Sequence, residues 1–210
     1  MDDSGYPTAM NGMIDGFRVI RALGSKSPAG TLLVRRSDSS EAAVLKFTSP
    51  QSSEKEALHR VEHAGVCQLL KAGTIEDHHY LLLSYYGQQT LMDRVEQGIA
   101  ISELTRIFLQ IAGALDALHQ QGYAHGDLRP EHVLIKSNGQ PVLIDLGSAY
   151  RTGENDTPLS PDQSGSPAYL SPERIQAASS TMVHQETASS GASDYYALGV
   201  IAFQLLSGRL

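Results

Sequence analysis

The chain has 210 residues, of which 41% are hydrophobic and 19% are charged, and its formal net charge is −7. This length and composition are typical of one or at most two compact globular units, and the acidic balance argues against sequence-independent nucleic-acid binding. Cys67 is the only cysteine, so no disulfide can form within the chain.

The sequence predicts neither a secretory signal peptide nor a membrane-spanning helix. No stretch reaches the ~18 apolar residues of a membrane-spanning helix. The segment from Met1 to Asn11 lacks the charged start and apolar run of a signal peptide. We therefore expect a cytoplasmic protein with no membrane contact within this chain, beginning with a flexible leader over residues 1–13.

Short β-type runs dominate the part of the chain that follows the leader. A lysine, Lys46, lies inside one of these runs, where a lone lysine is ordinarily a solvated edge residue. A helix is predicted to begin at Ser52 or Ser53, which suit an N-cap, and to run to about His63. The predicted strands are residues 17–24, 30–34, 41–47, 66–70 and 80–83.

The clearest predicted helix runs from Ser102 to about Gln121, and Gly122 provides a C-terminal stop. Its apolar residues recur at helical spacing on one face, which indicates core packing. They are Leu104, Ile107, Phe108, Ile111, Leu115 and Leu118.

Two aspartates flank a predicted hairpin. Residues 133–135 and 142–144 are β-type and surround Ser137 to Gln140, whose Asn-Gly is a strong hairpin signal. Asp127 precedes the hairpin and Asp145 follows it, so both carboxylates should lie near one mouth. They could be ordinary turn aspartates, but the pair also suits phosphoryl transfer, in which one carboxylate orients a hydroxyl and the other holds magnesium.

The C-terminal third alternates loop-like and apolar segments. Residues 151–165 have loop composition, and residues 177–192 form a low-complexity insert rich in Ser, Thr and Ala. The longest apolar segment, from Ala197 to Leu206, carries Gln204 and is predicted to be a buried helix.

Four motifs, which follow one another along the chain as they do in protein kinases, resemble those of that family. His125-Gly126-Asp127-Leu128-Arg129-Pro130-Glu131-His132 resembles the catalytic loop H-R-D-L-K-P-E-N, and Asp145-Leu146-Gly147 resembles D-F-G. Residues 43–46 resemble V-A-I-K, and residues 165–173 resemble the G-T-P-x-Y-L-A-P-E stretch of serine/threonine kinases.

The resemblance covers Phe17 to Leu210 and implies an α+β, bilobal protein-kinase-like fold. It places a small antiparallel β N-lobe at about 14–84, a hinge at 84–87 and a mostly helical C-lobe at 88–210. Kinase domains continue beyond the helix that starts near Asp194, so we expect an incomplete C-lobe that stops after its central buried helix.

The resemblance also implies a role for each matching residue. Asp127 would position and deprotonate a protein Ser/Thr hydroxyl, and Arg129 would steady the transferred group. Lys46, held by Glu54 (or, as a fallback, Glu56), would orient the phosphates of ATP. Ser166 would contact the catalytic aspartate through its hydroxyl, Asp194 would anchor the backbone of the catalytic loop, and Asp145 and His132 would bind the metal. The remaining nucleotide contacts would come from Leu23, Gly24, Gly30, Leu32, Val44, Leu83, Tyr85 and Leu134.

Two substitutions depart from the family pattern. His132 replaces the asparagine that binds a second magnesium, and imidazole suits softer metals, so we expect weakened magnesium-dependent activity and a preference for manganese. Gly126 replaces the loop arginine that grips a phosphorylated activation segment, so we expect activity without such phosphorylation.

Two alternative functions remain open. The first is a pseudokinase that acts as a nucleotide-binding or interaction module, which the altered glycine loop and His132 favour. The second is a small-molecule phosphotransferase, because His125-Gly126-Asp127 also resembles the H-G-D loop of antibiotic and choline kinases. The segment from Tyr169 to Glu173 argues against the second alternative.

Overall fold

The computed structural model describes residues 13–23, 30–38, 40–50, 52–153, 166–179 and 190–208. Of the expected leader, only Met13 lies among them. The chain divides into two compact units, Met1–Lys55 with Gln68–Tyr85 (unit 1) and Glu56–Cys67 with Tyr86–Leu210 (unit 2). Most of the predicted first helix thus groups with unit 2, although it falls inside the segment expected to form the N-lobe.

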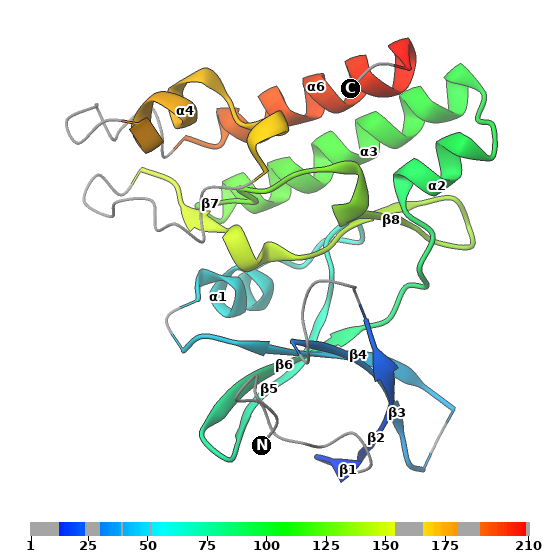
Figure 1. Ribbon diagram of the computed structural model, residues 1–210, viewed down its shortest axis with the longest axis vertical. Coiled ribbons are helices and arrows are strands. Elements are labelled where there is room, and N and C mark those ends of the chain that lie inside the picture. Colours follow the sequence, from blue (N-terminus) through cyan, green and yellow to red (C-terminus); the bar gives the residue numbers. More distant parts are fainter. Residues whose placement is uncertain are drawn as a thin grey trace. The chain divides into compact units, whose positions relative to one another are not determined.

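Unit 1 is built on an antiparallel six-stranded sheet of order β1-β2-β3-β4-β6-β5 (Figure 1). Alternation of half-buried and buried residues over the first four residues of β3 and along all of β4 directs one face into a core cluster that includes Leu32, Leu45 and Phe47. The strands are β1 Met13–Ile14, β2 Phe17–Ala22, β3 Thr31–Arg36, β4 Ala42–Thr48, β5 Leu69–Ile75 and β6 His78–Ser84.

The hairpin that joins β5 and β6 is tighter than the sequence predicted. The strands extend to Ile75 and from His78, so the turn consists of Glu76 and Asp77 alone, both with positive φ. Two-residue hairpin turns of this kind need positive φ, which Asp tolerates better than most residues that carry a side chain. The predicted strand 66–70 was therefore placed too early and drawn too short, and the predicted strand 80–83 lies inside β6 but was drawn too short.

A side-chain cluster ties the β1–β2 turn to the opposite edge of the same sheet. Asp15 lies in this turn and accepts hydrogen bonds from Lys71 Nζ on β5, at 2.5 Å, and from Tyr80 Oη on β6, at 2.6 Å. Burial, followed by the neighbouring carboxylate, raises the pKa of Tyr80 to about 12. The bonds from Lys71 and Tyr80 in turn lower the pKa of Asp15.

Helix α1, Ser53–Arg60, begins where the sequence predicted and ends three residues before His63. Ser52 Oγ accepts the N–H of Glu54 at 3.2 Å, as expected of a residue at the start of a helix.

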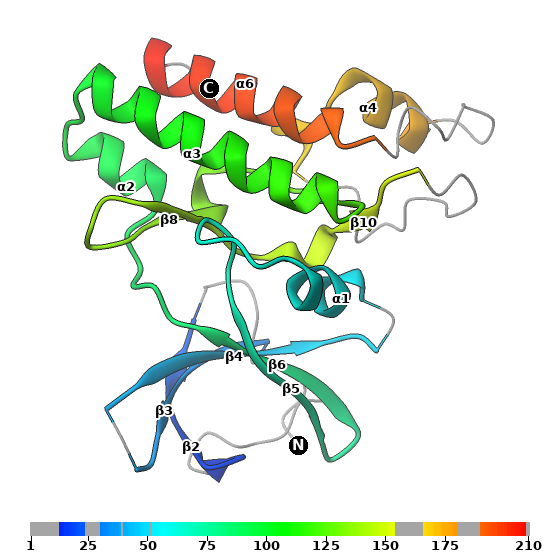
Figure 2. The ribbon, with the colours of Figure 1, turned by 180° about the vertical axis from the view of Figure 1, so that it is seen from behind.

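Unit 2 contains two long helices. Helix α3, Ile101–Gln120, buries five of the six residues predicted for its apolar face, and Phe108 is only half-buried. Helix α6, Ala192–Ser207, lies beside it in both views (Figures 1 and 2). The other elements of unit 2 are α2 Leu91–Glu96, α4 Pro172–Ser179, the ribbon of β7 Tyr123–Ala124 with β10 Tyr150–Arg151, and the hairpin of β8 Val133–Ile135 with β9 Pro141–Leu143.

Helix α6 is not the fully buried helix that its composition predicted. Ala197, Ile201 and Gln204 are buried, whereas Phe203 and Leu206 are 65% and 63% exposed. The helix has one side packed in unit 2, and hydropathy alone does not reveal how many sides of an apolar helix are covered. None of the helices in the described part of the chain is long and apolar enough to cross a membrane.

Candidate active site

Unit 1 contains the expected ion pair. Lys46 on β4 reaches Glu54 on α1, with 2.7 Å between Nζ and Oε1. The Glu54 side chain is 1% exposed and the Lys46 side chain 18% exposed, so the pair is largely removed from water. The fallback partner, Glu56, instead accepts hydrogen bonds from Tyr123 Oη at 2.9 Å and Arg151 Nη2 at 2.7 Å.

Strand register corrects one predicted nucleotide contact. Leu32 pairs with Leu45 and belongs to the core cluster, on the opposite face of the sheet from Lys46. Leu33 pairs with Val44 and is therefore the residue of β3 that shares a face with Val44 and Lys46. The segment from Gly24 to Gly30 matches the kinase glycine-rich loop G-x-G-x-x-G-x-V but is one residue longer, and this extra residue is the signal that could have moved the prediction from Leu32 to Leu33.

The other predicted nucleotide contacts lie on several elements. Leu83 on β6 pairs with Val44, and Tyr85 directly follows β6. Leu23 donates its N–H to Thr31 O at 2.8 Å beside the end of β2. Gly30 precedes β3 and Leu134 lies in β8 of unit 2, whereas Gly24 lies outside the described residues.

In unit 2 a buried aspartate anchors the catalytic loop. Asp194, on the first turn of α6, accepts the N–H groups of His125 at 2.8 Å and Gly126 at 3.0 Å, and it contacts Nε2 of His119 at 2.8 Å. Burial acts to raise the pKa of Asp194, but the bond from His119, the neighbouring His125 and the two backbone bonds outweigh it, so the pKa lies below its ordinary value. The expected anchoring role of Asp194 is confirmed.

Asp127 is oriented by the segment that precedes α4. Its Oδ1 accepts the backbone N–H of Ser166 at 2.6 Å, and the Ser166 hydroxyl accepts a hydrogen bond from Arg129 Nη1 at 3.0 Å. The prediction that the hydroxyl would contact Asp127 was therefore wrong, because the serine reaches the carboxylate through its backbone. Arg129 also donates from Nε to Glu131 Oε2 at 2.9 Å.

His132 lies between the two predicted carboxylates. Its Nδ1 is 2.8 Å from the backbone oxygen and 3.5 Å from Oδ2 of Asp127, and its Nε2 is 3.5 Å from Oδ2 of Asp145. The β8–β9 hairpin pairs Val133 with Leu143, so the predicted hairpin and the approach of both aspartates to one place are confirmed.

The donor set around His132 fits a divalent cation only in part. A carbonyl oxygen can only accept, so the 2.8 Å contact requires the proton on Nδ1 and leaves the Nε2 lone pair of a neutral ring facing Asp145. Two ligand atoms bound at about 2.0–2.2 Å to one ion lie about 3–3.5 Å apart, which the Nε2–Oδ2 separation matches. No group of three His, Cys, Asp or Glu side chains in the described residues forms a metal site, so phosphate or water would complete the shell.

Gly126 occupies a position that excludes a side chain. Its φ is +81°, and a Cβ built there would lie 2.3 Å from the backbone oxygen of Ser148. An arginine at this position is therefore incompatible with this loop conformation, which the sequence alone did not reveal.

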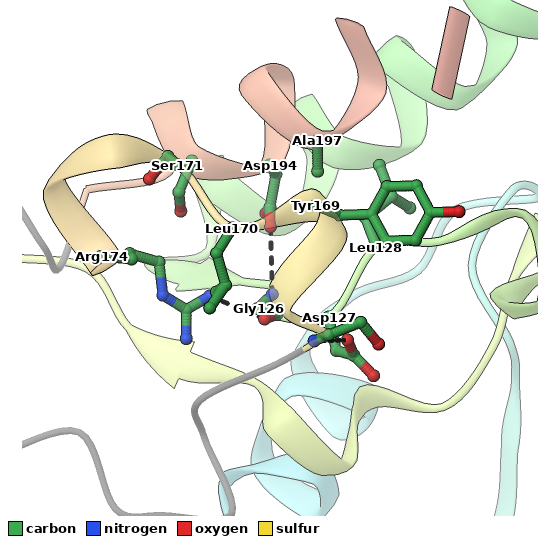
Figure 3. A pocket seen from close by; sticks show the side chains of 11 residues that line it. Gly126, Asp127, Leu128, Tyr169, Leu170, Ser171, Arg174, Asp194 and Ala197 are labelled. Carbon is green, nitrogen blue, oxygen red and sulfur yellow. Dashed lines mark hydrogen bonds between the residues drawn. The ribbon is translucent and has the colours of Figure 1, made fainter. Parts of the chain in front are cut away.

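Sequence reasoning also missed Arg174 on α4. It is 3% exposed and donates from Nη1 to Gly126 O at 2.6 Å. Figure 3 shows it beside a small cavity of about 10 Å³ lined by Gly126, Asp127, Ser171 and Asp194, among others. The only signal was its place directly after the kinase-like stretch ending at Glu173.

Comparisons with known proteins agree with this geometry. The chain is 28% identical over 190 residues to the probable serine/threonine-protein kinase PknB of Lactococcus lactis, covering 90% of this chain and 28% of PknB. It is 30% identical over 210 residues to human serine/threonine-protein kinase MRCK gamma, and the match covers 93% of this chain and 13% of MRCK gamma. The chain thus spans less than a third of the length of either relative.

The fold and the family model point the same way. The structure of the Cydia pomonella granulovirus kinase PK-1 matches with a TM-score of 0.73 at 21% identity, covering 92% of this chain and 69% of that one. The model of the protein kinase domain matches residues 18–210. With nearly the whole chain inside that match, the chain belongs to the protein kinase domain family.

Proposed function

We propose that this chain is the catalytic domain of a serine/threonine protein kinase, which transfers the γ-phosphate of ATP to a protein hydroxyl. The observation that carries the proposal is the placement of Asp127 and Asp145 on either side of one imidazole, each with a carboxylate oxygen 3.5 Å from it. Similarity to PknB and MRCK gamma, both named as serine/threonine-protein kinases, supports the substrate class.

Asp127 is the proposed general base. The bond from Ser166 N–H occupies Oδ1 and fixes the plane of the carboxylate, so Oδ2 takes the proton of the attacking hydroxyl. The hydroxyl oxygen bonds to the γ-phosphorus as the bond to the β-phosphate oxygen breaks, and ADP leaves. Arg129 lies next to this carboxylate and offers positive charge to the transferred group. Lys46, held by Glu54, contacts the α- and β-phosphates.

Asp145 and His132 are the proposed metal ligands. A divalent ion bound there neutralises charge on the phosphates. A neutral imidazole nitrogen is a poorer ligand for Mg²⁺ than an amide oxygen and suits Mn²⁺ better. We therefore propose ATP with Mn²⁺ or Mg²⁺ as the reactants, with Mn²⁺ preferred.

The test is transfer of labelled γ-phosphate to a generic basic protein, with each metal in turn. We expect incorporation by the wild type, loss with Asp127→Asn, and no loss with Asp116→Asn. Asp116 is a matched control because it lies on α3, where it accepts a hydrogen bond from Tyr195 and takes no part in the site. Absence of transfer with nucleotide binding intact would refute the proposal and favour the pseudokinase alternative, for which the replacement at His132 is the specific observation.

A further inference from the structure

Gly126, the residue that leads into Asp127, is held through both of its backbone polar groups. The N–H of Gly126 donates to Asp194 Oδ1 at 3.0 Å, and its carbonyl oxygen accepts from Arg174 Nη1 at 2.6 Å. Figure 3 shows Asp194, from α6, and Arg174, from α4, approaching Gly126 from different directions. Because a glycine has no side chain to limit its rotation, these two bonds restrain the two peptide units that meet at Gly126.

The guanidinium of Arg174 is itself fixed. It is buried, and its Cζ lies 4.9 Å from the ring centroid of Tyr150, within the range of a cation–π contact. The Tyr150 ring is secured by hydrogen bonds from its hydroxyl to Ser190 O at 3.1 Å and with Ser193 Oγ at 2.6 Å. A buried cation is costly unless it is well partnered, so the contacts of this arginine matter for the loop it holds.

The carbonyl that Arg174 binds belongs to the peptide bond between Gly126 and Asp127. Fixing this peptide plane fixes the backbone of Asp127, while the N–H of Ser166 fixes its carboxylate. Both restraints come from the short segment of residues 166–174. That segment therefore sets the position of the proposed general base at two points.

We propose that Arg174 is a positioning residue for Asp127, and that it supplies from α4 the cation that position 126 cannot carry. This inference rests on the proposed function, since positioning affects a rate only if Asp127 acts in catalysis. The guanidinium is buried against Gly126 and Tyr150, so it holds the loop without a phosphate on the activation segment.

The experiment compares Arg174→Ala and Arg174→Gln with the wild type in steady-state phosphate transfer. We expect kcat to fall about ten- to a hundredfold with the KM for ATP nearly unchanged, because misplacing a reacting group by a fraction of an ångström has effects of this order. Arg106→Met is the matched control, since Arg106 also points at a glycine carbonyl, that of Gly139, but at 3.4 Å on the exposed surface. Its kcat should equal that of the wild type.

Chemical rescue separates positioning from packing. Methylguanidinium should restore transfer by Arg174→Ala, whereas methylurea, a neutral molecule of similar shape, should not. Equal effects of the two compounds, or wild-type kcat in a folded Arg174→Ala, would overturn the proposal. If Arg174→Ala does not fold, Arg174→Gln decides, and wild-type kcat in that neutral variant overturns the proposal as well.

Amide hydrogen exchange provides a readout that does not depend on catalysis. We expect faster exchange at the N–H groups of His125 and Gly126 in both Arg174 variants and unchanged exchange in Arg106→Met. If the wild type transfers no phosphate, the proposed function fails, and the exchange rates still decide whether Arg174 holds the loop. Unchanged exchange in the Arg174 variants would show that it does not.

Discussion

Removal of either charge from the Lys46–Glu54 pair should lower the free energy of unfolding, but loss of the lysine should lower it more than loss of the glutamate. The Glu54 side chain is 1% exposed, so Lys46→Met removes the cation from a carboxylate that has almost no access to water. Loss of one partner from a buried pair costs about 3–5 kcal/mol. Glu54→Gln leaves the charge on Lys46, whose side chain is 18% exposed and can be solvated more readily, so we expect about 1–2 kcal/mol.

The double variant tests this reasoning. Lys46→Met with Glu54→Gln removes both charges, so the free energy of unfolding should be higher than that of Lys46→Met alone by about 1–2 kcal/mol. Urea denaturation of the full chain, followed by circular dichroism and by exchange protection of β4, measures these values. Arg36→Met is the control, because the Arg36–Asp38 pair is 54% and 66% exposed and should contribute less than about 1 kcal/mol. Additive single-site effects, or a larger cost for Glu54→Gln than for Lys46→Met, would refute the argument.

Three further predictions concern metal choice, pH and backbone conformation. His132→Asn should raise the ratio of the Mg²⁺ affinity to the Mn²⁺ affinity about tenfold or more in calorimetric titrations. An unchanged ratio would contradict the assignment of His132 as a metal ligand. Burial and the hydrogen bond to Asp15 raise the pKa of Tyr80 to about 12, so the protonated phenol contributes stability below pH ~10 that is lost as the pH rises towards 12. Tyr80→Phe should abolish that alkaline decline in melting experiments, and a decline of the same size would argue against it. Gly126→Ala should lower the free energy of unfolding by about 2–4 kcal/mol, whereas Gly113→Ala, in an open position on α3, should not lower it; equal effects would exclude a steric cause.

Features that depend on local sequence were predictable. The apolar residues of α3 recur at helical spacing, and the Asn-Gly turn places β8 opposite β9, so the approach of Asp127 to Asp145 followed from a hairpin of only a few residues. The pairing of Lys46 with Glu54 was implied by the resemblance to protein kinases, which left Glu56 as a fallback. In each case the partners lie within a short stretch of chain or on adjacent elements.

An uncertainty of one residue in the register of β3 was enough to assign Leu32 to the wrong face of the sheet. Side chains alternate between the two faces of a strand, so a shift of one residue moves the whole set to the opposite face. The longer glycine-rich segment left the starting point of β3 open, and the pairing of Leu33 with Val44 decides it. For α6, the sequence showed an apolar helix but carried no signal for which of its sides would be covered.

Gly126 shows what a motif comparison leaves out. Compared with the family pattern, the glycine is simply the loss of an arginine and of its positive charge. In the folded chain the residue is required by a positive φ and by the carbonyl of Ser148, and a cation reaches the same loop from Arg174, 48 residues later in the chain. No periodicity or spacing links these two positions, because the link is a single hydrogen bond to a backbone oxygen. The effect of the glycine at position 126 should therefore be judged together with the arginine that binds its carbonyl oxygen. The glycine alone does not indicate that the loop is inactive.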